Sequence, residues 1–377
     1  MIKPKTIGFP RMNKETGEIR VFLPEFIHGI AQRGLEIYIE DGFGSRSGYG
    51  SEDYCESYAN IQINDRKQAF EQDLVLILRS PTLKELEMCP PGTCLISKLH
   101  YPTRPKRIQK LTQLKLKSIS LDGIVNDRNL RLVENMKAVA WNGLEAAFGV
   151  LEERWPNLCR PDGQPIKVLI LGTGMVGKHA VDAATKLGNI ERNNEHMERY
   201  GFGALGIGVG RNISGNETIM ESLLRETDIL VDAAQRRDPS QPIVPNHWIA
   251  WLPEHAVITD LSVDPYTLDS PNPVVRGIEG IPQGNLNHYI FTPDDPLWDE
   301  SVPARIPSEQ RRTVVSCYSW PGIHPEACMR HYAQQLTPLL DILLKKGYDH
   351  LSLKGDYFER ALYRASLHGW LKTYSRQ

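Results

Sequence analysis

The chain has 377 residues, of which 41% are hydrophobic and 24% charged, and its formal net charge at pH 7 is −2. This length suits two domains better than one, because single hydrophobic cores stop growing near roughly 250–300 residues. The charge leaves no basic surface for nucleic acid or anionic lipid, and no apolar run approaches the roughly 20 residues that span a bilayer. We therefore expect a globular protein without nucleic-acid or membrane partners.

Strand-like and helix-like segments alternate in the first part of the chain, as in a parallel sheet. A helix is predicted to begin near Pro24, which suits the first turn of a helix, and to end at Gly34. Two more helices are expected, over 105–114 and from about 135 to 155. Strands are predicted over 6–8, 36–40, 74–78, 94–97 and 117–121.

The second part continues this alternation, with strands predicted over 168–171, 203–209, 228–234, 256–262 and 314–318. The segment 266–306 is rich in proline and aspartate and is expected to be a long surface excursion, of the kind that is usually functional. After Pro325 the pattern is helical to the end of the chain. Pro338 should kink or split the first of these helices, and Asp356 should be the N-cap of the last.

A glycine-rich motif follows the strand over 168–171. Gly172, Gly174 and Gly177 have the G-x-G-x-x-G spacing, and an amphipathic helical pattern then runs to Gly188. In a dinucleotide site these glycines allow a tight turn, close approach of a pyrophosphate and close packing of helix on strand. The helix start, with Met175 and Val176, offers N–H groups and a positive dipole end to the phosphates. The motif predicts dinucleotide binding.

Cysteine usage and the amino terminus indicate a cytoplasmic protein. The first eight residues lack the apolar core of a signal peptide. Six cysteines in a chain of this length, without C-x-x-C pairs or histidine at metal-ligand spacing, are typical of free thiols in a reducing compartment. They are Cys55, Cys89, Cys94, Cys159, Cys317 and Cys328. No metal site is expected.

The order and spacing of several motifs resemble the alanine dehydrogenase and transhydrogenase family, which includes lysine-forming saccharopine dehydrogenase and carboxyethyl-ornithine synthase. The likeness covers most of the chain. Besides the glycine-rich motif it includes Thr6-Ile-Gly-Phe-Pro-Arg11, Gly17-Glu-Ile-Arg-Val-Phe-Leu-Pro-Glu25, the segment 34–44, Leu78-Arg-Ser-Pro81, Leu95-Ile-Ser-Lys-Leu-His100, Ile258-Thr-Asp-Leu-Ser-Val-Asp264 and Trp320-Pro-Gly-Ile-His-Pro325.

The resemblance implies an α/β protein with two Rossmann-like, doubly wound parallel-sheet domains and an active site in the cleft between them. Residues 1–134 and 325–377 would form a discontinuous substrate domain, because the final helices of the family pack back on the first domain. Residues 135–324 would form the dinucleotide-binding domain. We also expect a homo-oligomer.

Amino-acid oxidation by hydride transfer passes through an imine, and such chemistry needs a group that moves protons near neutral pH. His100 follows the strand over 94–97, at the carboxyl edge where ligands of parallel sheets bind, and it matches the catalytic histidine of the family. Its alternative is a histidine on a surface loop. Asp264 matches the family aspartate near the nicotinamide ribose and the reacting centre. Asp260 is its rival, although an aspartate within a buried strand more often makes structural hydrogen bonds.

A substrate carboxylate needs a fixed cation, preferably a guanidinium. Arg20 matches the family arginine that holds this group, and its alternative is a solvated arginine at a strand end. Arg79 follows a buried apolar strand, where a charge is costly unless it faces a site. Relatives carry lysine at this position; arginine still binds carboxylate but cannot lose its proton at working pH, so a proton-transfer role would pass to His100. Arg104, in a basic segment, is a candidate for a second carboxylate or belongs to a solvated charge cluster.

The resemblance places further residues beside the cofactor. Trp320 and Pro321 match a segment beside the nicotinamide ring, although core packing explains Trp320 nearly as well. Ala234 and Leu261 are also assigned to the cofactor site.

The preference between NAD and NADP depends on the strand after the glycine-rich helix. An NAD site usually has an acidic residue about 20 residues after the glycines, at the end of that strand. Glu191 and Glu195 lie at this distance but in a polar segment predicted as helix or loop, whereas Arg211 follows the predicted strand. An arginine there can accept a 2′-phosphate, which slightly favours NADP. Arg211 can equally be a solvated turn residue.

The sequence thus predicts an NAD(P)-dependent oxidoreductase that acts on the CH–N bond of an amino acid or forms it from an oxo acid. Simple amino-acid oxidation and opine-type or saccharopine-type chemistry stay open. The alternatives are a partner-dependent NAD-binding transhydrogenase subunit, against which Arg20 and His100 argue, and a catalytically idle nucleotide-binding protein, which Arg79 keeps open.

Overall fold

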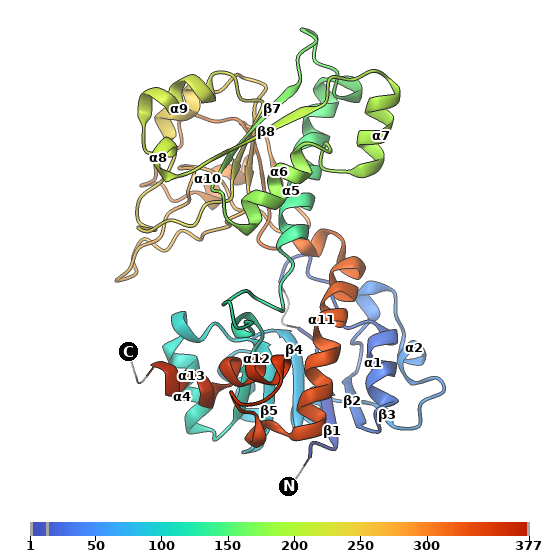
Figure 1. Cartoon of the computed structure of the whole chain (residues 1–377). Helices are drawn as coiled ribbons and strands as arrows, with labels where there is room; N and C mark the ends of the chain where they lie inside the picture. Colours follow the sequence, from blue (N-terminus) through green and yellow to red (C-terminus); the bar gives the residue numbers. More distant parts are fainter. Residues whose placement is uncertain (1–2, 13–14, 375–377) are drawn as a thin grey trace. The chain divides into compact units, whose positions relative to one another are not determined.

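The protein divides into two compact units, seen in a computed structural model that describes residues 3–12 and 15–374. Unit 1 comprises Met1–Asn135 and His324–Gln377, and unit 2 comprises Met136–Ile323. Unit 1 is therefore built from the two ends of the chain (Figure 1). No helix of the described residues is long and apolar enough to cross a bilayer.

Unit 1 contains a six-stranded parallel sheet in the order β3-β2-β1-β4-β5-β6. Central strands such as β4 are apolar along their length because helices cover both faces of the sheet. β3 was not predicted, because its alternation of isoleucine with polar residues spans only four positions. The strands are β1 (Thr6–Phe9), β2 (Glu36–Glu40), β3 (Ile61–Asn64), β4 (Leu74–Arg79), β5 (Cys94–Lys98) and β6 (Lys117–Ser120).

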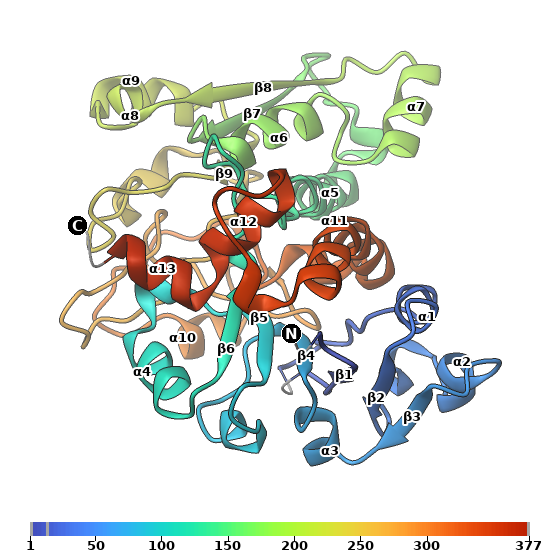
Figure 2. The same cartoon turned by 60° about the horizontal axis from the view of Figure 1, so that its bottom comes forward.

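The helices of unit 1 come from both ends of the chain. α1 and α2 lie toward the β2 and β3 end of this unit, and α4 lies toward the β6 end (Figure 2). The long helix α11 packs on the face of the sheet that carries Ile7 and Ile37. The helices are α1 (Pro24–Ala31), α2 (Ser51–Cys55), α3 (Arg66–Phe70), α4 (Pro105–Gln113), α11 (Pro325–Lys346), α12 (Tyr357–Ala365) and α13 (Leu367–Tyr374).

Two expectations for the C-terminal helices need correction. α11 runs through Pro338 without being split, because buried leucines on both sides of the proline, Leu336 and Leu340 among them, anchor the helix in the core. Asp356 is an N-cap, since its side chain accepts a hydrogen bond from the Glu359 N–H. The helix that it caps is α12, which a further helix, α13, follows.

Unit 2 contains a second six-stranded sheet in the order β11-β12-β10-β9-β7-β8. All pairs are parallel except β11 with β12. The two sheets confirm the prediction of two doubly wound α/β domains. The strands are β7 (Ile166–Leu171), β8 (Ala204–Val209), β9 (Ile229–Asp232), β10 (Val257–Asp260), β11 (Ile290–Phe291) and β12 (Thr313–Ser316).

Helices pack on both faces of this sheet, and each face has its own hydrophobic cluster. The segment 266–306, predicted as a surface excursion, is instead partly buried, because Ile278, Ile281 and Trp298 belong to a core cluster. It also forms the edge strand β11 and a short helix. The polar segment before β8 forms a helix of its own, α7. The helices are α5 (Met136–Arg154), α6 (Met175–Ala184), α7 (Ile190–Glu198), α8 (Arg211–Ser214), α9 (Glu217–Leu224) and α10 (Leu297–Ser301).

Each sheet reverses its strand order at one point. In unit 1 the reversal lies between β1 and β4, and in unit 2 between β7 and β9. Ligands of open parallel sheets bind outside the carboxyl ends of the strands at such switch points. The residues that follow β1, β4, β7 and β9 therefore define where a site can form in each unit.

Candidate active site

Charged side chains gather at the carboxyl edge of the unit 1 sheet. Arg79 is the last residue of β4, and Lys98 is the last residue of the neighbouring strand β5, where the two are register partners. Arg20 lies in the segment between β1 and α1. His100 follows β5 by two residues. The fold thus brings together Arg20, Arg79 and His100, which were predicted from separate motifs.

Arg20 forms a buried two-pronged ion pair with Glu18. Its Nε donates to Glu18 Oε1 at 2.8 Å and its Nη2 to Oε2 at 2.5 Å. Both side chains are nearly inaccessible, at 3% and 2% exposure. Burial opposes ionisation of Glu18, but the hydrogen bonds and charge of Arg20 outweigh it and lower the pKa of this carboxyl. Arg20 is therefore not the solvated arginine of the alternative interpretation.

Arg79 is more accessible and forms an ion pair with Glu15. Its Nη1 also lies 3.8 Å from Glu18 Oε2, so Glu18 connects the two arginines. Burial, only partly offset by Arg79, raises the pKa of Glu15. The end of β4 thus carries a partly accessible cation beside two carboxylates.

Lys98 lies over the ring of Tyr332 from α11. Its Nζ donates a hydrogen bond to Tyr332 Oη at 2.9 Å and lies 4.9 Å from the ring centroid. Burial of the amine, together with the positive charges of Arg20 and Arg79, lowers the pKa of Lys98 to about 8. Cys328, one turn before Tyr332 on α11, accepts a hydrogen bond from Arg20 Nη1 at 3.8 Å. α11 therefore supports two cations of the site.

His100 is oriented by Asp122, which lies in the single turn after β6. Its Nδ1 is 3.3 Å from Asp122 Oδ2, and its backbone N–H donates to Oδ1 at 3.2 Å. Although Asp122 is largely buried, the hydrogen bonds and charge of His100 and the hydroxyl of Ser120 lower its pKa. His100 has a left-handed backbone, with φ 51°, and non-glycine residues in this region are frequent at functional sites.

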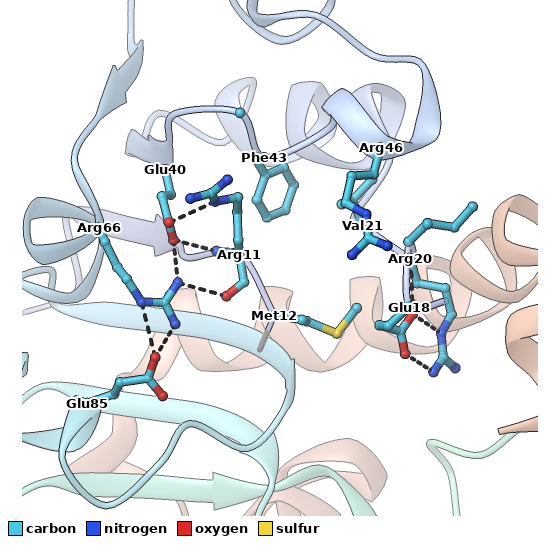
Figure 3. Close-up of a pocket in the computed structure, with 12 residues that line it drawn as sticks. Arg11, Met12, Glu18, Arg20, Val21, Glu40, Phe43, Arg46, Arg66 and Glu85 are labelled. Atoms are coloured by element: carbon cyan, nitrogen blue, oxygen red, sulfur yellow. Dashed lines mark hydrogen bonds and ion pairs between the residues drawn. The ribbon is translucent and has the colours of Figure 1, made fainter. Parts of the chain in front are cut away.

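A pocket of about 300 Å³ opens beside the Glu18–Arg20 pair. Figure 3 shows Glu18 and Arg20 on one side of it and a group formed by Arg11, Glu40, Arg66 and Glu85 on the other. Met12 and Phe43 lie between the two groups (Figure 3).

The far group is held together by ion pairs. Arg66 bridges Glu40 at 2.6 Å and Glu85 at 2.5 Å, and Arg11 Nε binds Glu40 at 2.8 Å. Arg46 also lines the pocket, and within residues 3–12 and 15–374 no carboxylate forms an ion pair with it. The pocket thus has one arginine more than its own carboxylates neutralise.

Arg104 lies apart from this pocket. It is exposed at the start of α4, and its Nη1 donates to the carbonyl of Thr103 at 3.3 Å. It does not line the pocket, and neither do Arg79, Lys98 and His100, but unlike them it has no contact with the charged groups at the ends of β4 and β5 among the described residues. Its location fits the solvated alternative better than a carboxylate-binding role.

The glycine-rich motif of unit 2 has the backbone that a dinucleotide site needs. Gly172 follows β7 with φ +101°, and a Cβ there would approach the Ala233 carbonyl to 2.7 Å. A Cβ on Gly177 would come within 2.0 Å of the Gly172 carbonyl, whereas one on Gly174 would meet nothing within 4 Å. The first and third glycines therefore allow tight packing, and the second leaves room above the amino end of α6. These residues fit a dinucleotide pyrophosphate.

Asp260 and Asp264 have different environments. Asp260 is buried at the end of β10, where it forms an ion pair with Arg276 and accepts a hydrogen bond from Ser316 at 3.2 Å. Asp264 lies beyond the strand, which ends at Asp260 and not at 262 as expected, because the chain bends there. Its side chain is 37% exposed and forms an ion pair with Arg236 at 2.7 Å. Asp260 therefore has a structural environment, and Asp264 is the more accessible carboxylate.

The other residues assigned to the cofactor are unevenly accessible. Met175, at the start of α6, is 48% exposed. Ala234 lies beside Gly172. Leu261, Trp320 and Pro321 are buried, and the Trp320 indole donates to the carbonyl of Asp260 at 2.6 Å. This burial favours the core-packing interpretation of Trp320.

The end of β8 carries no acidic residue. Gly210 and Arg211 follow this strand, and Arg211 Nη2 donates to the Gln235 carbonyl at 2.9 Å. Glu191 and Glu195 lie on α7, which precedes β8 and sits at the opposite end of that strand from α8 (Figure 1). Neither glutamate is therefore in the position of a ribose-binding acid.

Two family models cover most of both units. Residues 10–140 match the alanine dehydrogenase/PNT N-terminal domain, and residues 160–265 match the alanine dehydrogenase/PNT C-terminal domain. The chain belongs to the alanine dehydrogenase/PNT family. It is an oxidoreductase of this family, and its C-terminal family domain is of the type that binds NAD(P).

Relatives and solved structures agree with this assignment. The chain is 27% identical over 276 residues to an alanine dehydrogenase from Staphylococcus epidermidis, with 68% of this chain and 72% of the relative covered. It is 21% identical to NAD(P) transhydrogenase subunit alpha from Haemophilus influenzae, with 92% and 68% covered. A solved L-alanine dehydrogenase has the same fold, with a TM-score of 0.70, 20% identity, and 96% and 94% of the two chains covered.

Sequence reasoning missed several residues of the unit 1 site. Lys98 ends a buried apolar strand, which is the same signal that drew attention to Arg79. Asp122 likewise follows a buried strand, because it lies two residues after the end of β6. Glu18 and Tyr332 gave no comparable signal, because their roles depend on contacts with Arg20 and Lys98 that only the folded chain creates.

Proposed function

We propose that the protein is an NAD(P)-dependent dehydrogenase that oxidises an amino acid or secondary amino acid at its CH–N bond, and forms this bond in reverse. The observation that carries the proposal is the convergence of Arg20, Arg79, Lys98 and His100 at the carboxyl edge of the unit 1 sheet. Unit 1 would bind the substrate, and the glycine-rich edge of unit 2 would bind the dinucleotide. The family assignment supports this division.

The charged groups have complementary tasks in such a reaction. The arginines fix a substrate carboxylate, and Asp122 orients the imidazole of His100 for proton transfer. A bound nicotinamide would accept the hydride, and Gly172, Gly174, Gly177 and the start of α6 would hold its pyrophosphate. Asp264 is an accessible carboxylate beyond the carboxyl end of β10, and Arg236 keeps it in place.

The substrate that we infer is larger than alanine and carries a second anionic group. A volume of about 300 Å³ lies at the lower end of the range for small-molecule sites. Arg46 lines the pocket on the same side as Arg20 (Figure 3), so a carboxylate on a longer side chain or on a second amino-acid moiety would neutralise Arg46. This favours opine-type or saccharopine-type chemistry over simple alanine oxidation.

Steady-state assays test this proposal directly. Reduction of NAD and NADP would be measured with a panel of amino acids, and the reverse reaction with 2-oxo acids and either ammonia or a second amino acid. We expect the fastest turnover with a dicarboxylic or secondary amino acid. If alanine is the only amino acid of the panel that is turned over, the proposal of a larger substrate is rejected. If no combination of substrate and cofactor is turned over, the proposal of a dehydrogenase is rejected.

Cofactor preference should depend on Arg211. Replacing it with alanine should weaken NADP binding about ten- to a hundredfold and leave NAD binding nearly unchanged, because a charge-assisted contact of roughly 1.5–3 kcal/mol to the 2′-phosphate is lost. Titration of the purified protein with each cofactor measures this. Arg225→Ala is the matched control, since Arg225 is exposed at the C-terminal end of α9 and paired with Glu221. Equal affinities for both cofactors that the Arg211 change does not alter would contradict the preference for NADP.

A further inference from the structure

The proposed reaction needs a group that takes a proton from the substrate nitrogen. An amino acid is bound as its ammonium, which has no electron pair to form the C=N bond until one proton leaves. Neither Arg20 nor Arg79 can accept this proton, because a guanidinium stays protonated at working pH. Lys98, the last residue of β5, carries an amine at this edge beside Arg79.

We propose that Lys98 is the side chain that exchanges this proton. The geometry points to it because Lys98 ends β5 as the register partner of Arg79, and its amine lies above Tyr332 on the face of the sheet that α11 covers. The inference deepens the proposed function and rests on it. It assigns a proton-transfer role to a residue other than His100.

The surroundings of the amine favour its neutral form. Within residues 3–12 and 15–374 no carboxylate lies within ion-pair distance of Lys98, although most other charges of this edge are paired. Its Nζ donates a hydrogen bond to the Tyr332 hydroxyl at 2.9 Å. The charged and titratable groups that surround it come from several elements: Glu15, Glu18 and Arg20 before α1, Arg79 on β4, His100 after β5, Asp122 after β6, and Cys328 and Tyr332 on α11.

Among these groups, the two arginines disfavour the charged amine, and Asp122 and Cys328 oppose them. Burial of the amine is the larger cause, and together with the arginines it lowers the pKa of Lys98 to about 8, which leaves a useful fraction of neutral amine near neutral pH. A base with a pKa near the working pH transfers protons most efficiently.

The neutral amine of Lys98 takes one proton from the substrate ammonium and becomes an ammonium itself. The Cα–H bond then breaks with its electron pair going to the oxidised nicotinamide, while the nitrogen lone pair forms the C=N bond of an iminium. Water adds to the iminium carbon, and the C–N bond breaks to leave the oxo acid and the amine product. In the reverse direction the Lys98 ammonium returns the proton.

The state of the amine can be measured without turnover. In the full-length protein labelled with ¹³C at the lysine ε-carbons, the Lys98 signal is identified by its loss in Lys98→Arg. We expect its titration midpoint to lie at least about two units below the roughly 10.4 of an ordinary lysine. Lys117, on the neighbouring strand and paired with Asp349 at 2.6 Å, is the internal reference. A titration midpoint of Lys98 equal to that of Lys117 would overturn the inference.

The pH profile of the reaction supplies the second readout. In the unchanged enzyme, kcat/KM for amino-acid oxidation should rise through pH 8 as the amine loses its proton. Lys98→Arg keeps the positive charge, but a guanidinium cannot give up its proton at working pH. We therefore expect kcat to fall by roughly 10²–10⁴-fold with little change in KM, and the rise of kcat/KM through pH 8 to disappear. Lys117→Arg should keep both rate and profile. A Lys98→Arg enzyme with the rate and the rise of kcat/KM of the unchanged protein would overturn the role of Lys98.

Tyr332→Phe separates proton transfer from packing. The hydrogen bond from Lys98 to the Tyr332 hydroxyl favours the protonated amine. Its removal should therefore move the rise of kcat/KM to lower pH without abolishing this rise. If the rise of kcat/KM stays at the same pH or moves to higher pH, the contact on which the inference depends is contradicted. A shifted Lys98 midpoint in a protein without any dehydrogenase turnover would instead reject the proposed function, so the two failures are distinguishable.

Discussion

His100→Ala should lower turnover by roughly 10²–10⁴-fold, the usual loss when a general acid–base group is removed. Nδ1 of His100 lies 3.3 Å from Asp122 Oδ2, which favours the tautomer with the proton on Nδ1 and leaves Nε2 to exchange protons. The side chain is 50% exposed, so Nε2 is accessible to substrate or water. Dinucleotide affinity should stay unchanged, because the glycine-rich motif belongs to the other unit.

Two further variants make this result specific. Asp122→Asn removes the charge that orients the imidazole and should give a smaller loss of turnover. His350→Ala, at an exposed histidine of the same unit, should have no effect. Unchanged turnover of His100→Ala on the best substrate of the panel would show that the proton-transfer role lies elsewhere, and Lys98 would then be the remaining candidate at this edge.

Comparison of the sequence predictions with the structure shows which signals are local. Apolar runs such as 74–78 and 168–171 predicted central strands, because a strand covered on both faces must be apolar throughout. β3 and β11 were missed, since edge strands are short and need little apolar surface. Pro338 does not split its helix for a related reason. Buried leucines on either side of the proline keep α11 continuous, and a local sequence pattern does not show such packing.

Sequence patterns predicted a residue of the site only where its position alone, such as the end of an apolar strand, is informative. His100 and Arg79 were found because a polar side chain at the carboxyl end of a buried strand is informative by itself. The contacts that define their behaviour join residues far apart in the chain. Lys98 meets Tyr332 and Arg20 meets Cys328 through a helix more than 200 positions away. The depressed pKa of Lys98 is a property of that assembly, which no motif records.

The Glu18–Arg20 pair allows the strongest test of the carboxylate anchor. Arg20→Met should lower the free energy of unfolding by about 3–5 kcal/mol at pH 7, because it leaves a buried carboxylate without its partner. The double variant Glu18→Met with Arg20→Met should regain most of this stability, since two apolar side chains replace a buried pair at little cost. Denaturant unfolding of the three proteins measures both values.

The pH dependence follows from the lowered pKa of Glu18. In the unchanged protein this carboxyl stabilises the fold above its unfolded pKa, and the contribution is lost as the pH falls through the lower folded value. In Arg20→Met the folded pKa becomes raised instead, so the carboxyl destabilises the fold at neutral pH and ceases to do so once it is protonated. The stability difference between the two proteins should therefore narrow as the pH falls.

Substrate binding distinguishes an anchor from a structural arginine. Both the single and the double variant should raise KM by about ten- to a hundredfold, the effect of losing a charge-assisted contact to a carboxylate. Stability recovers in the double variant and substrate binding does not, because the pair is replaceable for folding while the guanidinium is required by the ligand. A double variant with the KM of the unchanged protein would show that Arg20 only supports the fold. The carboxylate would then have to bind at Arg79, which is the more accessible of the two arginines.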